Sequence, residues 1–145
     1  MLNNLHEFTQ LVHMLANKFD KSTMEIASKF NTPTAKKYIE LAKDMFATVM
    51  YQASYENIDH KIINLINNGA DVDVVTPIFF NKRFQRLLYI VYKTDQKNIA
   101  KLLLDAGANP NFIEGSKEKT LNYINTVGGI NPELQKLIKE AIEKW

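Results

Sequence analysis

Residues 65–73 read Leu-Ile-Asn-Asn-Gly-Ala-Asp-Val-Asp, and residues 103–111 read Leu-Leu-Asp-Ala-Gly-Ala-Asn-Pro-Asn. The two stretches are copies of one phrase, and a recurrence at this scale indicates a repeat architecture. Glycine adopts the left-handed conformation of a helix C-cap without a Cβ penalty. We therefore predict that Gly69 and Gly107 each end a helix and that the following turn leads the chain away from it.

The phrase resembles the end of the second helix of the ankyrin repeat, Leu-Leu-x-x-Gly-Ala-Asp/Asn-x-Asn, which precedes a β-turn finger. On this alignment repeat one covers residues 47–73, repeat two covers residues 86–111, and a closing repeat runs from residue 119 to the C-terminus. The interval from Arg86 to Lys119 matches the family's period of about 33 residues, and the interval before it is longer.

The alignment also shows departures from the family. Its Thr-Pro-Leu-His phrase, which starts the first helix of each repeat, is replaced by Ala-Thr-Val-Met at 47–50, Arg-Leu-Leu-Tyr at 86–89 and Lys-Thr-Leu-Asn at 119–122. Turns between paired helices are expected at 56–58, 95–97 and 128–130. Loss of the hydrogen bonds of the Thr-Pro-Leu-His phrase predicts irregular and individually weak repeats.

The N-terminal 46 residues carry helical signals of their own. Ser22 followed by Glu25 forms a capping box for a short helix that we expect to end near Asn31, and Thr32-Pro33 starts another helix. Both long segments are amphipathic, with apolar stripes at Leu5, Phe8, Val12, Leu15 and Phe19, and at Tyr38, Leu41, Met45, Val49 and Ala53.

The C-terminal segment reads as a capping helix. Asn131-Pro132-Glu133 opens it, and we expect Trp145 at its end to be packed. Its inward stripe consists of Leu134, Leu137, Ile138, Ala141, Ile142 and Trp145. We therefore predict one all-α domain over residues 1–145, an ankyrin-like helical solenoid. An N-terminal helical extension (1–46) precedes degenerate repeats with a C-terminal capping helix (47–145). Both end segments are expected because the outer faces of stacked repeats need covering.

Composition narrows the function classes. Hydrophobic residues make up 46% and charged residues 23% of the 145 residues, as in ordinary soluble domains. The formal net charge is +2 and the cations are spread along the chain, which argues against a dedicated nucleic-acid face. The chain has no cysteine, which excludes disulfides, cysteine-ligated zinc and thiol catalysis.

The sequence carries no targeting or spanning segment. Its N-terminus lacks the basic and apolar regions of a secretory signal, and no apolar stretch is long enough to cross a membrane. We expect a cytoplasmic protein, located in a host's cytosol if it is a secreted pathogen effector.

No residue pattern indicates catalysis, a cofactor or a metal. The histidines, His6, His13 and His60, have no zinc-type spacing, and we expect them at the surface or the edge of the core. Asp71 and Asp73 fall in the turn after Gly69, where aspartate bonds to backbone amides. We therefore expect a non-enzymatic protein, and an enzyme with an unrecognised site stays a lesser alternative.

The resemblance implies a partner-binding surface made of finger tips and the exposed ends of first helices. The sites it implies are Ser54, Tyr55, Lys82, Arg83, Gln85, Lys93, Thr94, Ser116, Glu118 and Thr126. In the first finger, Phe79 and Phe80 either anchor a partner together with Lys82 and Arg83 or fold back onto the repeats. Both interpretations stay open.

The leading hypothesis is a protein-binding module, an adaptor or an inhibitor, whose basic residues favour a partner with an acidic surface. The alternative is a nucleic-acid binder that uses the basic and aromatic finger at residues 78–86, where aromatic rings would stack on bases and cations would neutralise phosphates.

Overall fold

The computed structural model describes residues 2–50, 57–77 and 84–145. Within these ranges the chain is mainly helical, with one short antiparallel ribbon in which Thr76 pairs with Gln85. The predicted all-α class is confirmed. In chain order the elements are α1 (Leu2–Phe19), α2 (Thr23–Ser28), α3 (Pro33–Met50), α4 (Ile58–Asn67), β1 (Val75–Pro77), β2 (Phe84–Arg86), α5 (Leu87–Lys93), α6 (Lys97–Asp105), α7 (Lys117–Thr126) and α8 (Pro132–Lys144).

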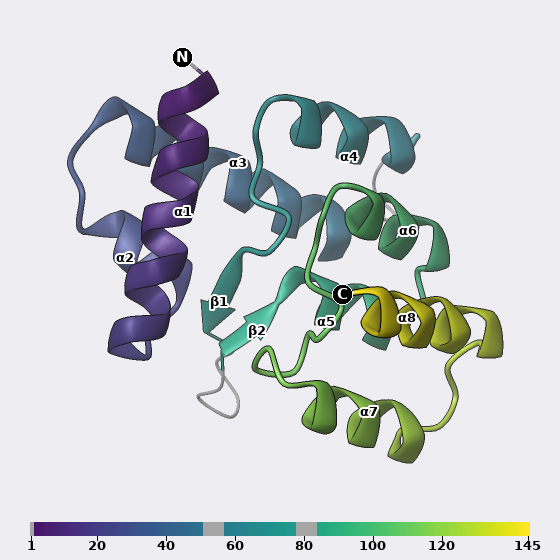
Figure 1. Cartoon of the computed structure of the whole chain (residues 1–145). Coiled ribbons are helices and arrows are strands. Elements are labelled where there is room, and N and C mark those ends of the chain that lie inside the picture. The colour runs from purple at the N-terminus through teal and green to yellow at the C-terminus, as the bar shows by residue number, and fades with distance from the viewer. Residues whose placement is uncertain (1, 51–56, 78–83) are drawn as a thin grey trace.

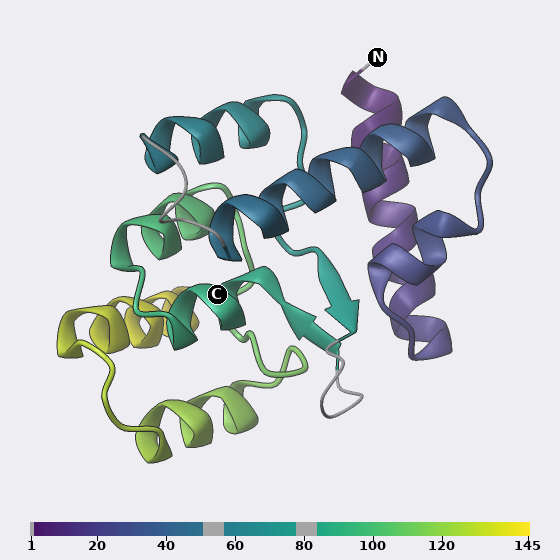
Figure 2. The same ribbon diagram turned by 180° about the vertical axis from the view of Figure 1, so that it is seen from behind.

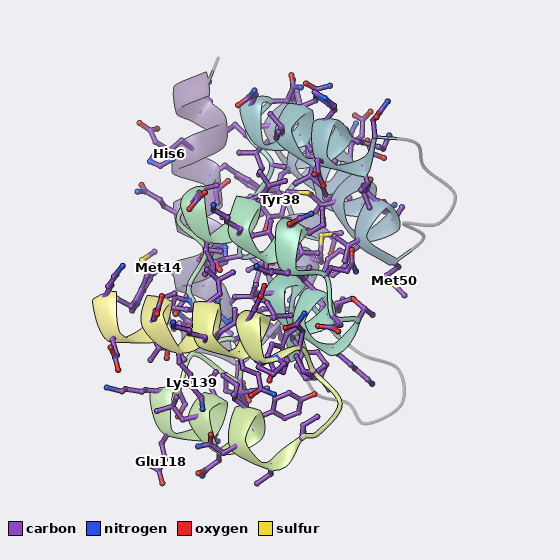
Figure 3. The ribbon with its side chains drawn as sticks, turned by 90° about the vertical axis from the view of Figure 1, so that its right-hand side faces the viewer. His6, Met14, Tyr38, Met50, Glu118 and Lys139 are labelled. Carbon is purple, nitrogen blue, oxygen red and sulfur yellow. The ribbon has the colours of Figure 1, made fainter. Side chains whose placement is uncertain are left out.

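Six of the helices form three consecutive pairs, α3 with α4, α5 with α6 and α7 with α8. The second helices share one face of the molecule (Figure 1), where α4 contacts α6 and α6 contacts α8. Of the first helices, α3 and α5 lie on the opposite face (Figure 2), and α7 lies next to α8 at the end of the row (Figures 1 and 3). Helices α1 and α2 pack against α3 at the end of the molecule far from α7 and α8.

The two glycines end their helices in the same way. Gly69 and Gly107 have φ values of +97° and +98°. Just beyond them, the amide of Ala70 donates to the carbonyl of Leu65 and the amide of Ala108 donates to that of Leu103, each at 3.0 Å. The prediction that these glycines close helices is confirmed, and the helices they close, α4 and α6, lie in contact.

Side chains join each turn to the next one. The amide of Asn109 donates to Asp73 Oδ1 at 2.8 Å, and the amide of Asn131 donates to Asp95 Oδ1 at 3.2 Å. Both bonds join residues that are 36 positions apart. Turns on both sides of the molecule are thus held in register by a carboxylate that accepts a backbone amide from the following pair.

The predicted helix starts are also confirmed. Ser22 Oγ accepts the Glu25 amide at 3.0 Å, Thr32 Oγ1 accepts the Ala35 amide at 3.1 Å, and Asn131 Oδ1 accepts the Glu133 amide at 2.8 Å. Each bond satisfies an amide of the first helical turn that has no partner within the helix. The short second helix ends at Ser28, slightly before the expected Asn31.

One expected helix start is wrong. Residues 47–50 form the end of α3, because Thr32 and Pro33 already start this helix and it continues without a break to Met50. The boundary expected between residues 46 and 47 therefore falls inside a helix. The stripe of Tyr38, Leu41, Met45 and Val49 is buried as predicted, and Ala53 lies outside the described residues.

Two residues expected to be packed are exposed. Phe19 is 55% exposed because it ends α1 beyond Ala16, the last buried residue of that helix. Trp145 is 64% exposed because it caps α8 beyond Ile142, the last buried residue of that helix.

We predict that Gly69→Ala destabilises the protein more than Gly107→Ala. Both changes force a side chain into a left-handed conformation, which costs about 1–2 kcal/mol. At Gly69 the new Cβ would also lie 2.6 Å from Leu5 Cδ2 of α1, whereas nothing lies within 4 Å at Gly107. We expect an excess of about 1–3 kcal/mol from this overpacking, measured by urea unfolding.

Leu5→Ala provides the control, because it removes the atoms that the new Cβ would meet. In this background the cost of Gly69→Ala should fall to that of Gly107→Ala. An undiminished excess would show that α1 does not pack on this turn as described.

Candidate protein-binding surface

Several predicted interface residues cannot be placed. Ser54, Tyr55, Phe79, Phe80, Lys82 and Arg83 lie outside the described residues. Of Gln85 only the backbone is described, where it pairs with Thr76 in the ribbon. The role of the finger thus stays a prediction.

Three predicted residues lie at the C-terminal ends of first helices. Lys93 and Thr94 end α5, Thr126 ends α7, and all three are exposed. The bond between Asp95 and the Asn131 amide places the turns after these two helices side by side. Lys93, Thr94 and Thr126 therefore belong to one edge of the molecule.

The same edge continues to α3. Gln96 Nε2 donates to the carbonyl of Val49 at 3.3 Å and to Thr94 Oγ1 at 2.6 Å, which joins the end of α3 to the turn after α5. Met50, the next residue, is 58% exposed and lies at the outer end of α3 (Figure 3). An exposed methionine is an adaptable apolar contact of the kind used at binding surfaces.

The other two predicted residues lie elsewhere. Ser116 is the N-cap of α7 and accepts the Lys119 amide at 3.2 Å, so its side chain has a structural role. Glu118, two residues further on in the first turn of α7, is exposed and points away from the body (Figure 3). The predicted residues thus divide between the two ends of α7 instead of forming one patch.

An aromatic cluster connects α5 and α7 on the face of the first helices. The half-buried rings of Tyr89 and Tyr123 lie 5.5 Å apart, and both contact Phe112. The Tyr123 ring also contacts the buried Tyr92. Burial and a hydrogen bond with the Tyr89 hydroxyl raise the pKa of Tyr123. The Lys93 ammonium lies 6.0 Å from the centre of the Tyr89 ring, within the range of a cation–π contact.

The sequence did not mark these tyrosines as interface residues. Tyr89 stands at the position of the histidine in the Thr-Pro-Leu-His phrase, and Tyr123 lies one residue beyond the corresponding Asn122. Two aromatic residues near equivalent positions of successive repeats were the available signal. Their meeting depends on how α5 and α7 are placed, which no local pattern specifies.

A second polar cluster, around Asp71, has a structural role. Asp71 Oδ2 accepts the Tyr38 hydroxyl at 2.6 Å and lies 2.6 Å from His13 Nε2, while Asp71 Oδ1 accepts the Asp73 amide at 2.9 Å. Burial, and then the charge of Asp71, raise the pKa of Tyr38. These contacts satisfy the carboxylate and tie α1 and α3 to the turn after α4.

The hollow next to this cluster has a volume of about 530 Å³ and lies between α1 and residues 69–73. Its polar walls include His6, which is exposed and points outward (Figure 3), and His13. Among the described residues no three histidine or acidic side chains gather closely enough to hold a metal ion. Nor is any helix within those ranges long and apolar enough to cross a membrane.

Comparisons with protein-family models, with curated proteins and with solved structures find no match to this chain.

We predict opposite effects for two substitutions of Asp73. Asp73→Ala should cost about 1–3 kcal/mol, because the Asn109 amide loses its acceptor. Asp73→Asn keeps an acceptor oxygen for the Asn109 amide and removes a buried charge. At pH 7 it should therefore increase the free energy of unfolding slightly, by less than about 1 kcal/mol.

The gain from Asp73→Asn should depend on pH. Burial raises the pKa of Asp73 despite the Asn109 amide and Arg86, so the folded protein holds this proton more tightly than the unfolded chain. Stability from this group is then greatest below the unfolded pKa and falls as pH rises through the folded pKa. Urea unfolding from pH 3 to pH 7 should show the gain of Asp73→Asn growing with pH, and a gain that shrinks with pH would contradict this assignment.

Proposed function

We propose that this chain is a degenerate ankyrin-type repeat module that binds another protein through the face formed by α3, α5 and α7. The proposal describes a non-catalytic adaptor or inhibitor that acts in the cytoplasm. The observation that carries it is the half-buried Tyr89–Tyr123 pair beside the exposed Lys93.

The equivalent helix ends support the repeat assignment. Gly69 and Gly107 close neighbouring second helices with matching φ values and matching hydrogen bonds. Short turns join α5 to α6 and α7 to α8, as in helix pairs of a stacked repeat. Thr32-Pro33 at the start of α3 also matches the first two residues of the Thr-Pro-Leu-His phrase, in place of residues 47–50.

The chemistry of the first-helix face supports a protein partner. Tyrosine is enriched among residues that dominate interface energies, since a rigid ring buries much area at little entropic cost and its hydroxyl can form a hydrogen bond. Met50 and Lys93 extend this face along the edge where the first helices end. Lys93, together with the predicted finger residues Lys82 and Arg83, favours an acidic surface on the partner.

Charge reversal on this face should weaken partner binding. A partner recovered from a lysate with the wild-type protein would be titrated calorimetrically against Lys93→Glu and against Lys82→Glu/Arg83→Glu. We expect the Kd to rise at least about tenfold for each variant, roughly 1.4 kcal/mol, because each change places like charges against an acidic surface. The melting temperature of Lys93→Glu should fall by no more than about 4 °C, because this side chain is exposed and loses only its cation–π contact with Tyr89.

The matched control is Lys101→Glu/Lys139→Glu, which reverses two charges on α6 and α8, helices of the opposite face (Figures 1 and 3). Its Kd should stay within about threefold of the wild-type value, less than 1 kcal/mol. Equal losses in the control would show that net charge, and not this face, determines binding. Binding of single-stranded DNA or RNA with a steep salt dependence would instead favour the nucleic-acid alternative.

A further inference from the structure

The corner where α1 meets α2 encloses a small hollow that is separate from the first-helix face. Its volume is about 280 Å³, room for one large side chain. The corner lies at the end of the molecule opposite α7 and α8 (Figure 1). Its walls are Leu15, Phe19, Lys21, Ile26, Lys29 and Phe30.

The walls of the hollow are mainly apolar and reach the surface. The Phe19 side chain is 55% exposed, although aromatic rings of monomeric proteins are usually covered. The apolar surface continues along α1 through Leu11 and Met14, which are 36% and 59% exposed and lie within one helical turn of Leu15. A contiguous exposed apolar surface of this kind marks an interaction site.

Two lysines, Lys21 and Lys29, line the hollow. The neighbouring Lys21 ammonium lowers the pKa of Lys29. Within the described part of the chain neither ammonium lies within 4.0 Å of a carboxylate. Glu25 acts on Lys29 in the opposite direction but more weakly, and its carboxylate lies 3.5 Å from the Ser22 hydroxyl.

A third cation lies beside the same ring. The Lys18 ammonium is 5.5 Å from the centre of the Phe19 ring. Three lysines thus border an apolar recess, and an anionic group placed between Lys21 and Lys29 would relieve their repulsion. The complementary ligand has an apolar body that fills the recess and carboxylates at its edge.

We propose that this corner is a second docking site, which takes an acidic segment of a partner protein in which one large apolar side chain is flanked by carboxylates. The apolar side chain fills the hollow, and the carboxylates pair with Lys21 and Lys29. A peptide fits better than a lipid surface, because the lining side chains form a recess that a single side chain can enter. The site does not depend on the face of α3, α5 and α7.

The test is a titration of the full ¹⁵N-labelled chain with the peptide acetyl-Asp-Glu-Leu-Trp-Glu-Glu-amide, followed by amide chemical shifts. We expect saturable shifts confined to residues 11–30. Lys21→Glu/Lys29→Glu should raise the Kd at least tenfold, and Phe19→Ala should raise it several-fold. The fold should survive both changes, because Phe19 and Lys29 are exposed and Lys21 is half-buried at the rim.

Lys36→Glu/Lys37→Glu is the matched control, since it reverses two adjacent exposed lysines on α3. Its Kd should stay within twofold of the wild-type value. Lys93→Glu should also leave the peptide affinity unchanged, which separates this site from the first-helix face.

Three results would overturn the proposal: no saturable shifts, an equal loss in the Lys36/Lys37 control, or shifts centred on α5 and α7. Binding to phosphatidylserine vesicles without binding to the peptide would replace it with a membrane contact.

Discussion

The bond from the Asn109 amide to the Asp73 carboxylate holds one helix pair against the next, and the placement of the other pair depends on a contact of the same kind. A lone helix pair cannot bury its apolar face, so each pair is stable only beside a neighbour. Gly69 and Gly107, both left-handed, are each followed two residues later by a short acidic or amide side chain that accepts a backbone amide of the same turn. Asp71 accepts the amide of Asp73, and Asn109 accepts the amide of Asn111, both at 2.9 Å.

The first turn of this type has no earlier turn beside it, and α1 takes the place of that neighbour. Asp71 is the residue of the first turn that corresponds to Asn109. Its carboxylate accepts a hydrogen bond from the Tyr38 hydroxyl of α3 and contacts the His13 imidazole of α1. Leu5 packs directly over Gly69. The N-terminal extension thus covers the first helix pair with an aromatic and apolar face. Its position is fixed by the buried carboxylate of Asp71.

Local chemistry explains what could be predicted from the sequence. The glycine ends of α4 and α6, and the caps at Ser22, Thr32 and Asn131, depend on residues within a few positions of each other, so their patterns were sufficient. The turns within the helix pairs, expected at 95–97 and 128–130, were also correctly placed.

Tertiary geometry explains what could not be predicted. Residues 47–50 looked like a helix start because they were aligned on a family phrase, yet the upstream Thr32-Pro33 signal already determines the helix. The exposure of Phe19 depends on how far α1 extends past the helices it packs against. The contact of Tyr89 with Tyr123 depends on the placement of α5 against α7. For the candidate binding surface, therefore, only Lys93, Thr94 and Thr126 could be grouped from the sequence, and the aromatic centre could not.

If the helix pairs are repeats, as proposed, the same physics explains why they need so little sequence signal. Their turns need only a glycine and a short side chain with an oxygen acceptor, and their helices need only a buried stripe at the right spacing. Exposed residues such as Lys93 and Phe19 form neither the turns nor the buried stripes. Their substitution can therefore alter partner binding while the helix pairs stay packed. In the proposed repeats the Thr-Pro-Leu-His phrase is replaced, and the turns are ordered by bonds from the Asn109 amide to Asp73 and from the Asn131 amide to Asp95.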